Sequence, residues 1–312
     1  MEKLSVIVPC YNEEEALPLF YAEICRVAET EQSVEWEFDF VDDGSKDGTL
    51  PLLRSLAAKD GRVRFTSFSR NFGKESAMYA GFQMAQGDYC AVMDADLQDP
   101  PALLPQMLRA IREEGYDSVA TRRVTREGEP KLRSFFARKF YRIMNGISDA
   151  DIVDGARDFR LMRRAMADAV LSMGEYSRFS KGIFGWVGFK TKWLPYKNVE
   201  RAAGTTKWSF RKLFKYAVEG IVSYSSAPLL IAYGLGALFC AAAFLLFLVL
   251  VIVSLASGRA IPAAGGIIAL ILFVGGAQLG CLGILGEYVS RTYLETKKRP
   301  VYIVRETEKG LK

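Results

Sequence analysis

Strand and helix signals alternate through the first 123 residues, and this pattern constrains the fold more than any other feature. Apolar runs predict strands at 5–11, 38–44, 63–69, 89–96 and 117–123. Helical patterns between them predict helices near 14–30, 47–59, 74–86 and 100–114. Such alternation predicts an α/β fold with a mostly parallel sheet and helices on both faces. Ligands of such a sheet bind at the carboxyl ends of the strands, where the strand order reverses.

Acidic residues come at the ends of three predicted strands. Strand 38–44 ends in Asp42 and Asp43, and strand 89–96 ends in Asp94 and Asp96. The first strand runs into an acidic segment that includes Glu13. A solvated acidic rim is the alternative for any one of these clusters. Because the ends of parallel strands meet at one edge of a sheet, three clusters together favour a ligand site.

The residue types available restrict the chemistry of such a site. The chain contains no histidine, which excludes Ser-His-Asp hydrolases, histidine zinc sites and histidine acid-base catalysis. Its five cysteines are scattered and resemble reduced core residues. Asp94 and Asp96 are two apart on a strand, so their side chains point the same way. Carboxylates without histidine or cysteine predict Mg²⁺ or Mn²⁺, held partly by substrate phosphates.

Two apolar runs near the C-terminus predict membrane spans. They extend from Leu229 to Leu255 and from Ile261 to Leu285, each about 25 residues, whereas a crossing needs roughly 20. A buried helix pair is the alternative. The short connector predicts a hairpin, and Lys and Arg residues flank its outer ends. The positive-inside rule then predicts a multi-pass protein of the inner membrane, with both termini and the N-terminal portion in the cytoplasm.

Further features favour contact with lipid and with phosphate. Segments 131–147 and 210–222 combine basic and aromatic faces, which predicts helices in a membrane interface; core-packing helices are the alternative. The net charge of +5 suits anionic lipid or phosphate ligands. Gly276 and Gly280 form a GxxxG spacing, which suits close helix packing and predicts a homo-oligomer. Nothing in the sequence indicates a nucleic-acid partner.

Several motifs follow one another in a specific order. They are VIVPCYNEEEAL, VDDGSKDGT, SRNFGKESAMYAGFQMAQGDY and MDADLQDPP. With them the chain resembles the inverting, GT-A-fold glycosyltransferases of family 2. The stretches DFRLMRR (158–164), RFSKGIFGWVGF (178–189) and AGTTKWSFRKL (203–213) narrow the resemblance to the polyprenyl-phosphate sugar synthases. This group includes bactoprenol glucosyltransferases and dolichol-phosphate mannose synthases, and the resemblance covers essentially the whole chain.

The resemblance implies roles for individual residues. Those expected to bind the nucleotide sugar are Pro9, Tyr11, Glu13, Asp42, Asp43, Asp94, Ala95, Asp96 and Gln98. Asp94 and Asp96 would hold the metal beneath the diphosphate. Those expected to approach the donor or acceptor phosphate are Arg122, Lys181, Arg201 and Lys207. Asp158 and Asp96 are the expected catalytic residues.

Transfer of a sugar to a phosphate fits a chain without histidine. Negative charge grows on the departing oxygen of the nucleotide diphosphate, and a divalent cation with Lys and Arg stabilises that charge. A phosphate monoester has its second pKa near 6 and is mostly dianionic at neutral pH, so it needs no strong base. Asp158 is therefore either a base or a positioning residue. A helix cap or an ion pair with Arg160 or Arg163 is the structural alternative.

These observations predict an enzyme with one catalytic domain followed by membrane-associated segments. Residues 1–208 form the cytoplasmic GT-A domain, 209–228 a juxtamembrane helix, 229–286 the two spans and 287–312 a cytoplasmic tail. The predicted reaction transfers a hexose, glucose from UDP-glucose, to undecaprenyl or another polyprenyl phosphate. GDP-mannose and other nucleotide sugars stay open as donors. A polysaccharide-extending synthase, although no QxxRW motif occurs, and a catalytically silent scaffold are the alternatives.

Overall fold

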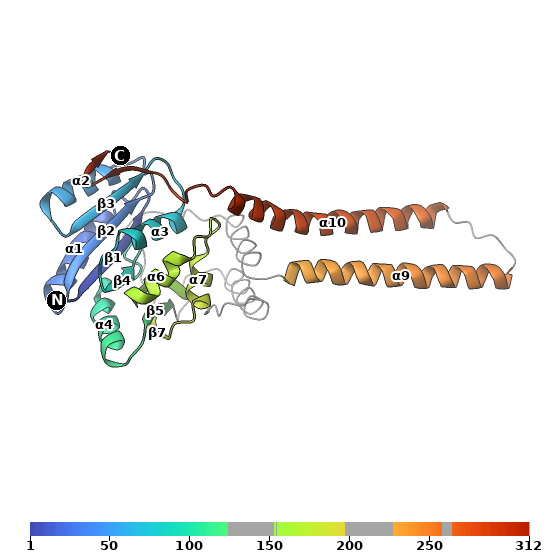
Figure 1. Ribbon diagram of the computed structural model, residues 1–312, viewed down its shortest axis with the longest axis horizontal. Helices are drawn as coiled ribbons and strands as arrows, with labels where there is room; N and C mark the ends of the chain where they lie inside the picture. The colour runs from blue at the N-terminus through green and yellow to red at the C-terminus, as the bar shows by residue number, and fades with distance from the viewer. Residues whose placement is uncertain (124–152, 154, 197–226, 258–263, 312) are drawn as a thin grey trace. The chain divides into compact units, whose positions relative to one another are not determined.

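The computed structural model describes residues 1–123, 153, 155–196, 227–257 and 264–311 (Figure 1). The chain forms two compact units. One comprises residues 1–220 and 299–312, and the other comprises residues 221–298. The sheet and the predicted site residues that the structure describes belong to the first unit.

Nine strands of the described residues form one sheet in the order β7-β5-β6-β4-β1-β2-β3-β8-β9. They are β1 (Lys3–Cys10), β2 (Glu35–Asp42), β3 (Val63–Phe68), β4 (Tyr89–Val92), β5 (Ser118–Arg123), β6 (Ala156–Arg163), β7 (Thr191–Tyr196), β8 (Val304–Thr307) and β9 (Gly310–Leu311). Strand β1 pairs in parallel with β2 and β4, and β2 pairs in parallel with β3. Strand β6 runs antiparallel to both β4 and β5. The first three strands and β5 match the predicted ranges to within three residues at each end. Strand β4 ends at Val92 rather than at 96, so Asp94 and Asp96 lie in the turn after the strand and not on it as predicted.

Helices connect the parallel strands where the sequence predicts them. They are α1 (Leu17–Thr30), α2 (Thr49–Lys59), α3 (Lys74–Met84) and α4 (Leu104–Glu113), the last preceded by the 3₁₀ turn η1 (Pro101–Leu103). Two further helices, α6 (Arg164–Ser172) and α7 (Ser180–Trp186), follow β6. The predicted α/β architecture is confirmed. The chain leaves β3 on one side of β1 and continues at β4 on the other, so the strand order reverses beside β1.

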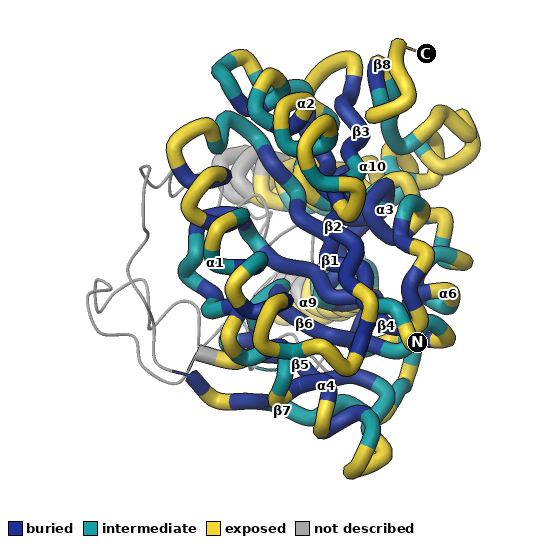
Figure 2. The backbone as a smooth tube through the Cα atoms, turned by 90° about the vertical axis from the view of Figure 1, so that its left-hand side faces the viewer, coloured by how far each residue is buried: buried dark blue, intermediate teal, exposed yellow. Residues whose placement is uncertain are grey.

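The core lies on both faces of the central strands. Figure 2 shows β1 and β2 as buried backbone enclosed by helices whose outer sides are exposed. Phe20 of α1 meets Phe40 of β2 edge to face, with ring centroids 6.4 Å apart. Parallel strands covered on both faces are apolar nearly throughout, which explains why these runs were easy to locate in the sequence.

The end of the chain returns to the sheet, which the sequence analysis did not predict. Strand β8 pairs antiparallel with β3 and covers an edge that would otherwise expose unpaired backbone groups. Tyr302 stacks on Phe68 with ring centroids 4.7 Å apart. The guanidinium of Arg54 donates to both carboxylate oxygens of Glu306, at 2.7 and 2.6 Å. Residues 299–311 therefore belong to the sheet of the first unit and to its packing.

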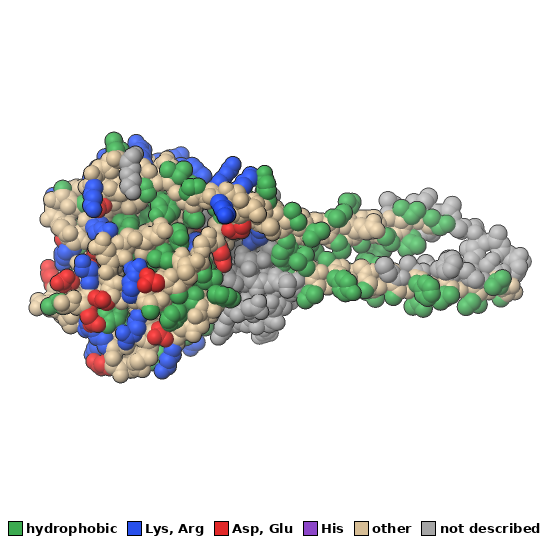
Figure 3. All heavy atoms as spheres, viewed as in Figure 1, with side chains coloured by type: hydrophobic (Ala, Val, Ile, Leu, Met, Phe, Trp, Pro, Cys, Tyr) green, Lys and Arg blue, Asp and Glu red, His purple; other side chains and the backbone are tan. Residues whose placement is uncertain are grey.

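The predicted membrane hairpin is wrong. Two long helices form in the second unit, α9 (Ala227–Ser257) and α10 (Ala264–Thr296), and Phe239 packs against Phe273 with centroids 4.9 Å apart. Figure 3 shows hydrophobic side chains along both helices. Within the described parts of the chain, however, no helix combines the length and the apolar character required to cross a membrane. Helix α10 also continues to Thr296, past the predicted end of the span at Leu285, and carries an ion pair between Glu287 and Arg291 in this extension.

The structure also bears on the other expectations for the C-terminal half of the chain. The predicted multi-pass placement in the inner membrane, with cytoplasmic termini, is contradicted by the same finding. The predicted interface segments 131–147 and 210–222 lie outside the described residues. A Cβ atom added to Gly276 or Gly280 would meet nothing within 4 Å, so these glycines serve no close approach within the described chain. The homo-oligomer and the boundaries at 208, 228 and 286 stay predictions.

Helix α3 depends on a glycine where it crosses β1, and this generates a stability prediction. A Cβ at Gly81 would lie 2.1 Å from Cγ2 of Ile7, closer than any real contact. We expect Gly81→Ala to lower the free energy of unfolding by about 1–3 kcal/mol in urea denaturation of the full-length protein. Gly61→Ala is the control because its Cβ meets nothing within 4 Å. Equal effects of the two substitutions would contradict this packing.

Candidate active site

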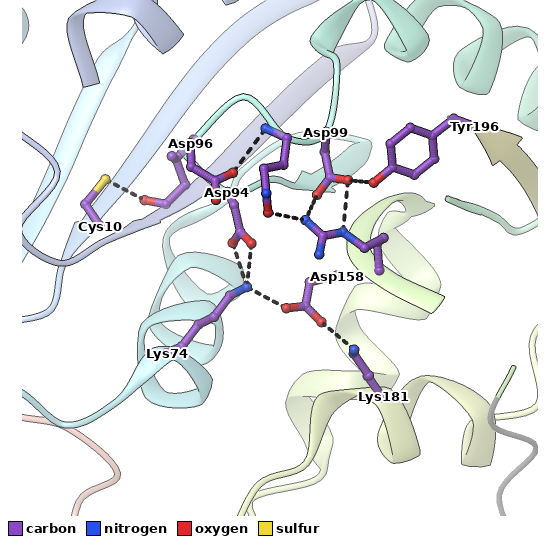
Figure 4. A network of polar contacts seen from close by, with 11 residues as sticks. Cys10, Lys74, Asp94, Asp96, Asp99, Asp158, Lys181 and Tyr196 are labelled. Carbon is purple, nitrogen blue, oxygen red and sulfur yellow. Dashed lines mark hydrogen bonds and ion pairs between the residues drawn. The ribbon is translucent and has the colours of Figure 1, made fainter. Parts of the chain in front are cut away.

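Carboxylates from two neighbouring strands meet at one lysine. Asp94 follows the end of β4, and Asp158 lies in β6, the antiparallel neighbour of β4. Lys74, the first residue of α3, places its Nζ 2.6 Å from Oδ1 of Asp94 and 2.5 Å from Oδ2 of Asp158 (Figure 4). Lys181 of α7 approaches the other side of Asp158, with Nζ 4.0 Å from Oδ1. We call Asp94, Lys74 and Asp158 the ion triad.

The ion triad shifts the pKa values of its members in opposite directions. Burial alone would raise the pKa of Asp158, but the attraction of Lys74 and Lys181 holds it well below its usual range. Burial would lower the pKa of Lys74, yet Asp158 and Asp94 together raise it well above its usual range. Lys74 and Asp158 are therefore charged throughout the neutral pH range. A carboxylate with so low a proton affinity is a poor base.

Asp43 fixes the segment from which Lys74 projects. Its Oδ1 accepts the backbone N–H of Phe72 at 2.6 Å, and its Oδ2 accepts that of Gly73 at 2.9 Å. Burial raises the pKa of Asp43 to about 6, although these two hydrogen bonds favour the ionised form. Gly73 has φ 100°, a conformation that suits glycine. Asp43 thus positions the start of α3.

The turn after β4 carries the second acid of the DxD motif. Asp96 is 7% exposed, and its Oδ1 accepts the backbone N–H of Gln98 at 3.1 Å. Leu97 between them has φ 56°, which is rare for a leucine. Such conformations concentrate at functional sites, where the surrounding structure enforces them. Ala95 is buried between the two acids.

A second set of contacts holds this turn from the far side. Asp99, which is 1% exposed, receives hydrogen bonds from Arg157 at 3.2 and 3.3 Å and one from the hydroxyl of Tyr196. Arg157 also donates to Oε1 of Gln98 at 3.3 Å. The strands β6 and β7 thereby fix the position of the DxD turn (Figure 4). The sequence analysis assigned no role to Asp99, Arg157 or Tyr196.

A cavity of about 460 Å³ opens at the ends of β1, β2 and β3. Its lining includes Tyr11, Asp42, Lys46, Ser67, Arg70 and Arg305. Asp42 is held there by Ser67, whose hydroxyl donates to Oδ2 at 2.6 Å, and by the backbone N–H of Ser45 at 3.0 Å. We call this the nucleotide cavity. Of its lining residues the sequence analysis predicted Tyr11 and Asp42.

Two features of the nucleotide cavity depend on distant parts of the chain. Arg305 comes from β8, and no sequence signal indicated that residues 304–307 return to this edge. Gly44, with φ 66°, lets the loop after β3 approach the loop after β2. A Cβ there would lie 2.5 Å from the carbonyl carbon of Arg70. Only glycine fits this approach without displacing backbone.

The remaining predicted residues lie apart from the ion triad or outside the described chain. Pro9 lies in β1 opposite Val41, and the backbone N–H of Glu13 donates to Oγ1 of Thr49 at 2.8 Å. Arg122 lies in β5 and is exposed. Arg201 and Lys207 fall within residues 197–226, which the structure does not describe.

Comparison with known proteins identifies the family. Residues 5–171 match Glycosyl transferase family 2. The chain belongs to this family. It is also 41% identical, over 98% of its length and 100% of the relative's, to a protein of Escherichia coli (strain K12) named prophage bactoprenol glucosyl transferase homolog. The bactoprenol glucosyl transferase of Shigella phage SfII is 38% identical over 99% of both chains.

The family match makes this chain a glycosyltransferase with a GT-A-like α/β sheet. Among solved structures, mannosyl-3-phosphoglycerate synthase from Rubrobacter xylanophilus superposes with a TM-score of 0.49 at 18% identity. That comparison covers 70% of this chain and 72% of the other.

One more acidic residue links the site's two helices. The backbone N–H of Ser180 donates to Oε2 of Glu75 at 2.9 Å, and the Ser180 hydroxyl donates to the same oxygen. This ties the start of α7, which carries Lys181, to the start of α3. Burial raises the pKa of Glu75 to about 7; Ser180 lowers it, and the charge of Asp158 raises it further.

The raised pKa of Glu75 predicts a pH-dependent stability. Its ordinary value is 4.5, so its contribution is complete below about pH 4.5 and is lost as the pH rises through about 7. Glu75→Gln should remove this dependence, so that between pH 4.5 and 8 the wild type loses about 1–2 kcal/mol more unfolding free energy than the variant. Urea denaturation across that range measures it. Parallel profiles of the two proteins would show that Glu75 does not titrate there.

Proposed function

We propose that this glycosyltransferase transfers a hexose, glucose from UDP-glucose, to the phosphate of a polyprenyl phosphate with inversion. The observation that carries the proposal is the ion triad, which joins the DxD turn to Asp158 and Lys181 beside the nucleotide cavity. Two relatives that align over nearly the whole chain, one named a bactoprenol glucosyl transferase and the other a homolog of one, support the sugar and the acceptor. They do not specify the nucleotide.

The donor occupies the nucleotide cavity in this proposal. Tyr11 and Asp42 contact the nucleoside, and the cations Lys46, Arg70 and Arg305 neutralise part of the donor's negative charge. The diphosphate then extends along the sheet edge toward the turn that carries Asp94 and Asp96. Pro9, Glu13 and Asp43 support this edge through the backbone, as their contacts indicate.

Asp94 and Asp96 are the proposed ligands of Mg²⁺ or Mn²⁺. Such ions bind through one or two protein carboxylates and take further oxygens from substrate phosphates and water. The donor set fits in its chemistry, because the turn after β4 presents two carboxylates and Mg²⁺ and Mn²⁺ prefer oxygen ligands. When bound, the ion supplies positive charge for the departing diphosphate.

Asp158 acts by position rather than as a base in this mechanism. An oxygen of the acceptor phosphate forms the new bond to the anomeric carbon while the bond to the diphosphate oxygen breaks. The electron pair of that bond leaves with the nucleotide. No proton must be removed, because the phosphate monoester is mostly dianionic at neutral pH. Asp158, with its lowered pKa, holds Lys74 toward the donor and Lys181 toward the acceptor.

The proposal predicts which acids transfer requires. Asp94→Asn and Asp96→Asn should each lower kcat/KM for hexosyl transfer by roughly 100-fold or more, because charge stabilisation at the leaving group is lost. The measurement is mass detection of the hexosyl prenyl phosphate from UDP-glucose, with Mg²⁺, with Mn²⁺ and with a chelator. Parallel reactions with GDP-mannose and UDP-N-acetylglucosamine test the donor.

A control acid separates the site from general loss of charge. Asp88 lies just before β4, at the opposite end from the DxD turn, and accepts the backbone N–H of Lys3 at 2.8 Å. Asp88→Asn should leave transfer unchanged. Full transfer in chelator by a protein lacking both Asp94 and Asp96 carboxylates would refute the proposed reaction mechanism.

A further inference from the structure

A second cavity lies beside β6, the strand that carries Asp158, and its lining includes Lys181. Its volume is about 190 Å³, far above the roughly 15 Å³ that admits one water molecule. The residues that matter in its lining are Arg160, Lys181, Phe184, Phe189 and Trp193. The cavity therefore combines two cations with three aromatic rings, and β6, α7 and β7 provide its walls.

Arg160 is the unusual member of this lining. It is 4% exposed, its guanidinium carbon lies 4.0 Å from the ring centroid of Phe184 and 5.7 Å from that of Trp193, and its Nε has no hydrogen-bond partner. No hydrogen bond or ion pair joins its guanidinium to another described residue. Burial lowers the pKa of Arg160 to about 9, and Asp158 partly offsets this, so the group is a cation at neutral pH.

Another buried arginine shows what a structural role requires. Arg178 is 9% exposed and lies over the ring of Tyr79 at 4.4 Å, much as Arg160 lies over Phe184. The Nε of Arg178 is also without a hydrogen-bond partner among the described residues, but its two terminal nitrogens, unlike those of Arg160, donate to the backbone carbonyl oxygens of Met173 and Val170. A buried guanidinium left without such acceptors is costly for the fold. The free-energy cost of burying the Arg160 guanidinium is explained if a bound anion accepts its hydrogen bonds.

The neighbours of Arg160 indicate the kind of anion. Arginine presents a planar fork of donors that matches phosphate oxygens, and Lys181 adds a second charge at the cavity. The Lys181 Nζ lies 4.0 Å from Asp158, too far for a hydrogen bond, so its donors can serve a ligand. The aromatic rings offer an apolar surface next to the two cations.

We propose that this cavity binds the phosphate of a prenyl phosphate acceptor, with Arg160 and Lys181 on the phosphate and the rings of Phe184 and Trp193 on the first isoprene units. The inference rests on the proposed function and names its acceptor site. Asp158 and Arg160 are two residues apart in β6, so they share a face of the sheet. A phosphate at Arg160 thus lies across Asp158 and Lys74 from Asp94, opposite the donor.

The test compares Arg160→Met with the wild type. We expect the KM for the acceptor to rise roughly 10- to 100-fold, because a charge-assisted pair of hydrogen bonds is lost. Calorimetric binding of the nucleotide sugar should not change. The unfolding midpoint should stay equal or rise, because an unpaired buried charge is removed. Arg160→Lys keeps the positive charge but loses the planar arrangement of N–H donors. It should therefore raise the acceptor KM less than Arg160→Met does.

Arg178→Met is the matched control. It removes an equally buried, ring-stacked arginine, so it should lower the unfolding midpoint and leave the acceptor KM unchanged. If Arg160→Met instead lowers the midpoint as much and leaves the acceptor KM unchanged, Arg160 is structural and the inference is overturned. If the wild type transfers no hexose to prenyl phosphate, the proposed function fails, which is a separate outcome.

Measurements of ligand binding without the donor sugar tell whether the cavity prefers a prenyl phosphate or free inorganic phosphate. Dimethylallyl phosphate should raise the unfolding midpoint of the wild type but not that of Arg160→Met, and dimethylallyl alcohol should raise neither. Inorganic phosphate at the same concentration should protect the wild type less, because it lacks contact with the rings. Equal protection by inorganic phosphate would assign the cavity to free phosphate and overturn the claim of a lipid headgroup.

Discussion

The contact of Lys74 with Asp94 and Asp158 is the interaction on which the site depends. Asp94 follows β4, and Asp158 lies in β6, the antiparallel neighbour of β4. Both carboxylates lie within 2.6 Å of the same ammonium nitrogen, and without its positive charge they would repel each other. Lys74 pairs with both carboxylates and so weakens their repulsion. Asp43 fixes its position by accepting the backbone N–H groups of the two residues that precede it. Asp43 thus determines where the central cation lies.

The sheet topology places a different cavity on each side of the strands that meet at Lys74. Parallel strands β1, β2 and β3 end at the nucleotide cavity, whereas antiparallel β6 lines the smaller cavity around Arg160 together with α7 and β7. Lys74 lies at the boundary between β4 and β6, where parallel pairing gives way to antiparallel pairing. The proposed reaction runs across that boundary, from the donor on one side to the acceptor on the other.

Local patterns predicted part of this arrangement. The apolar strands and the acids at their ends were evident because parallel strands are buried on both faces and ligands gather at their ends. Asp94, Asp158 and Lys181 were identified by motif, and the structure brings them together. Lys74 and Arg305 were missed, because only tertiary structure brings α3 to β6 and the chain end to β3. The membrane hairpin was inferred from run length and apolar composition alone, and the structure contradicts it.

A double-mutant cycle between Lys74 and Asp158 tests the central claim most directly. The measured quantity is kcat/KM for hexosyl transfer by Lys74→Met, by Asp158→Asn and by the double variant. Each single change leaves a partner charge uncompensated, so the double variant should lose far less than the sum of the two losses in activation free energy. If the two losses add, Lys74 and Asp158 act independently, and the account of the ion triad is contradicted.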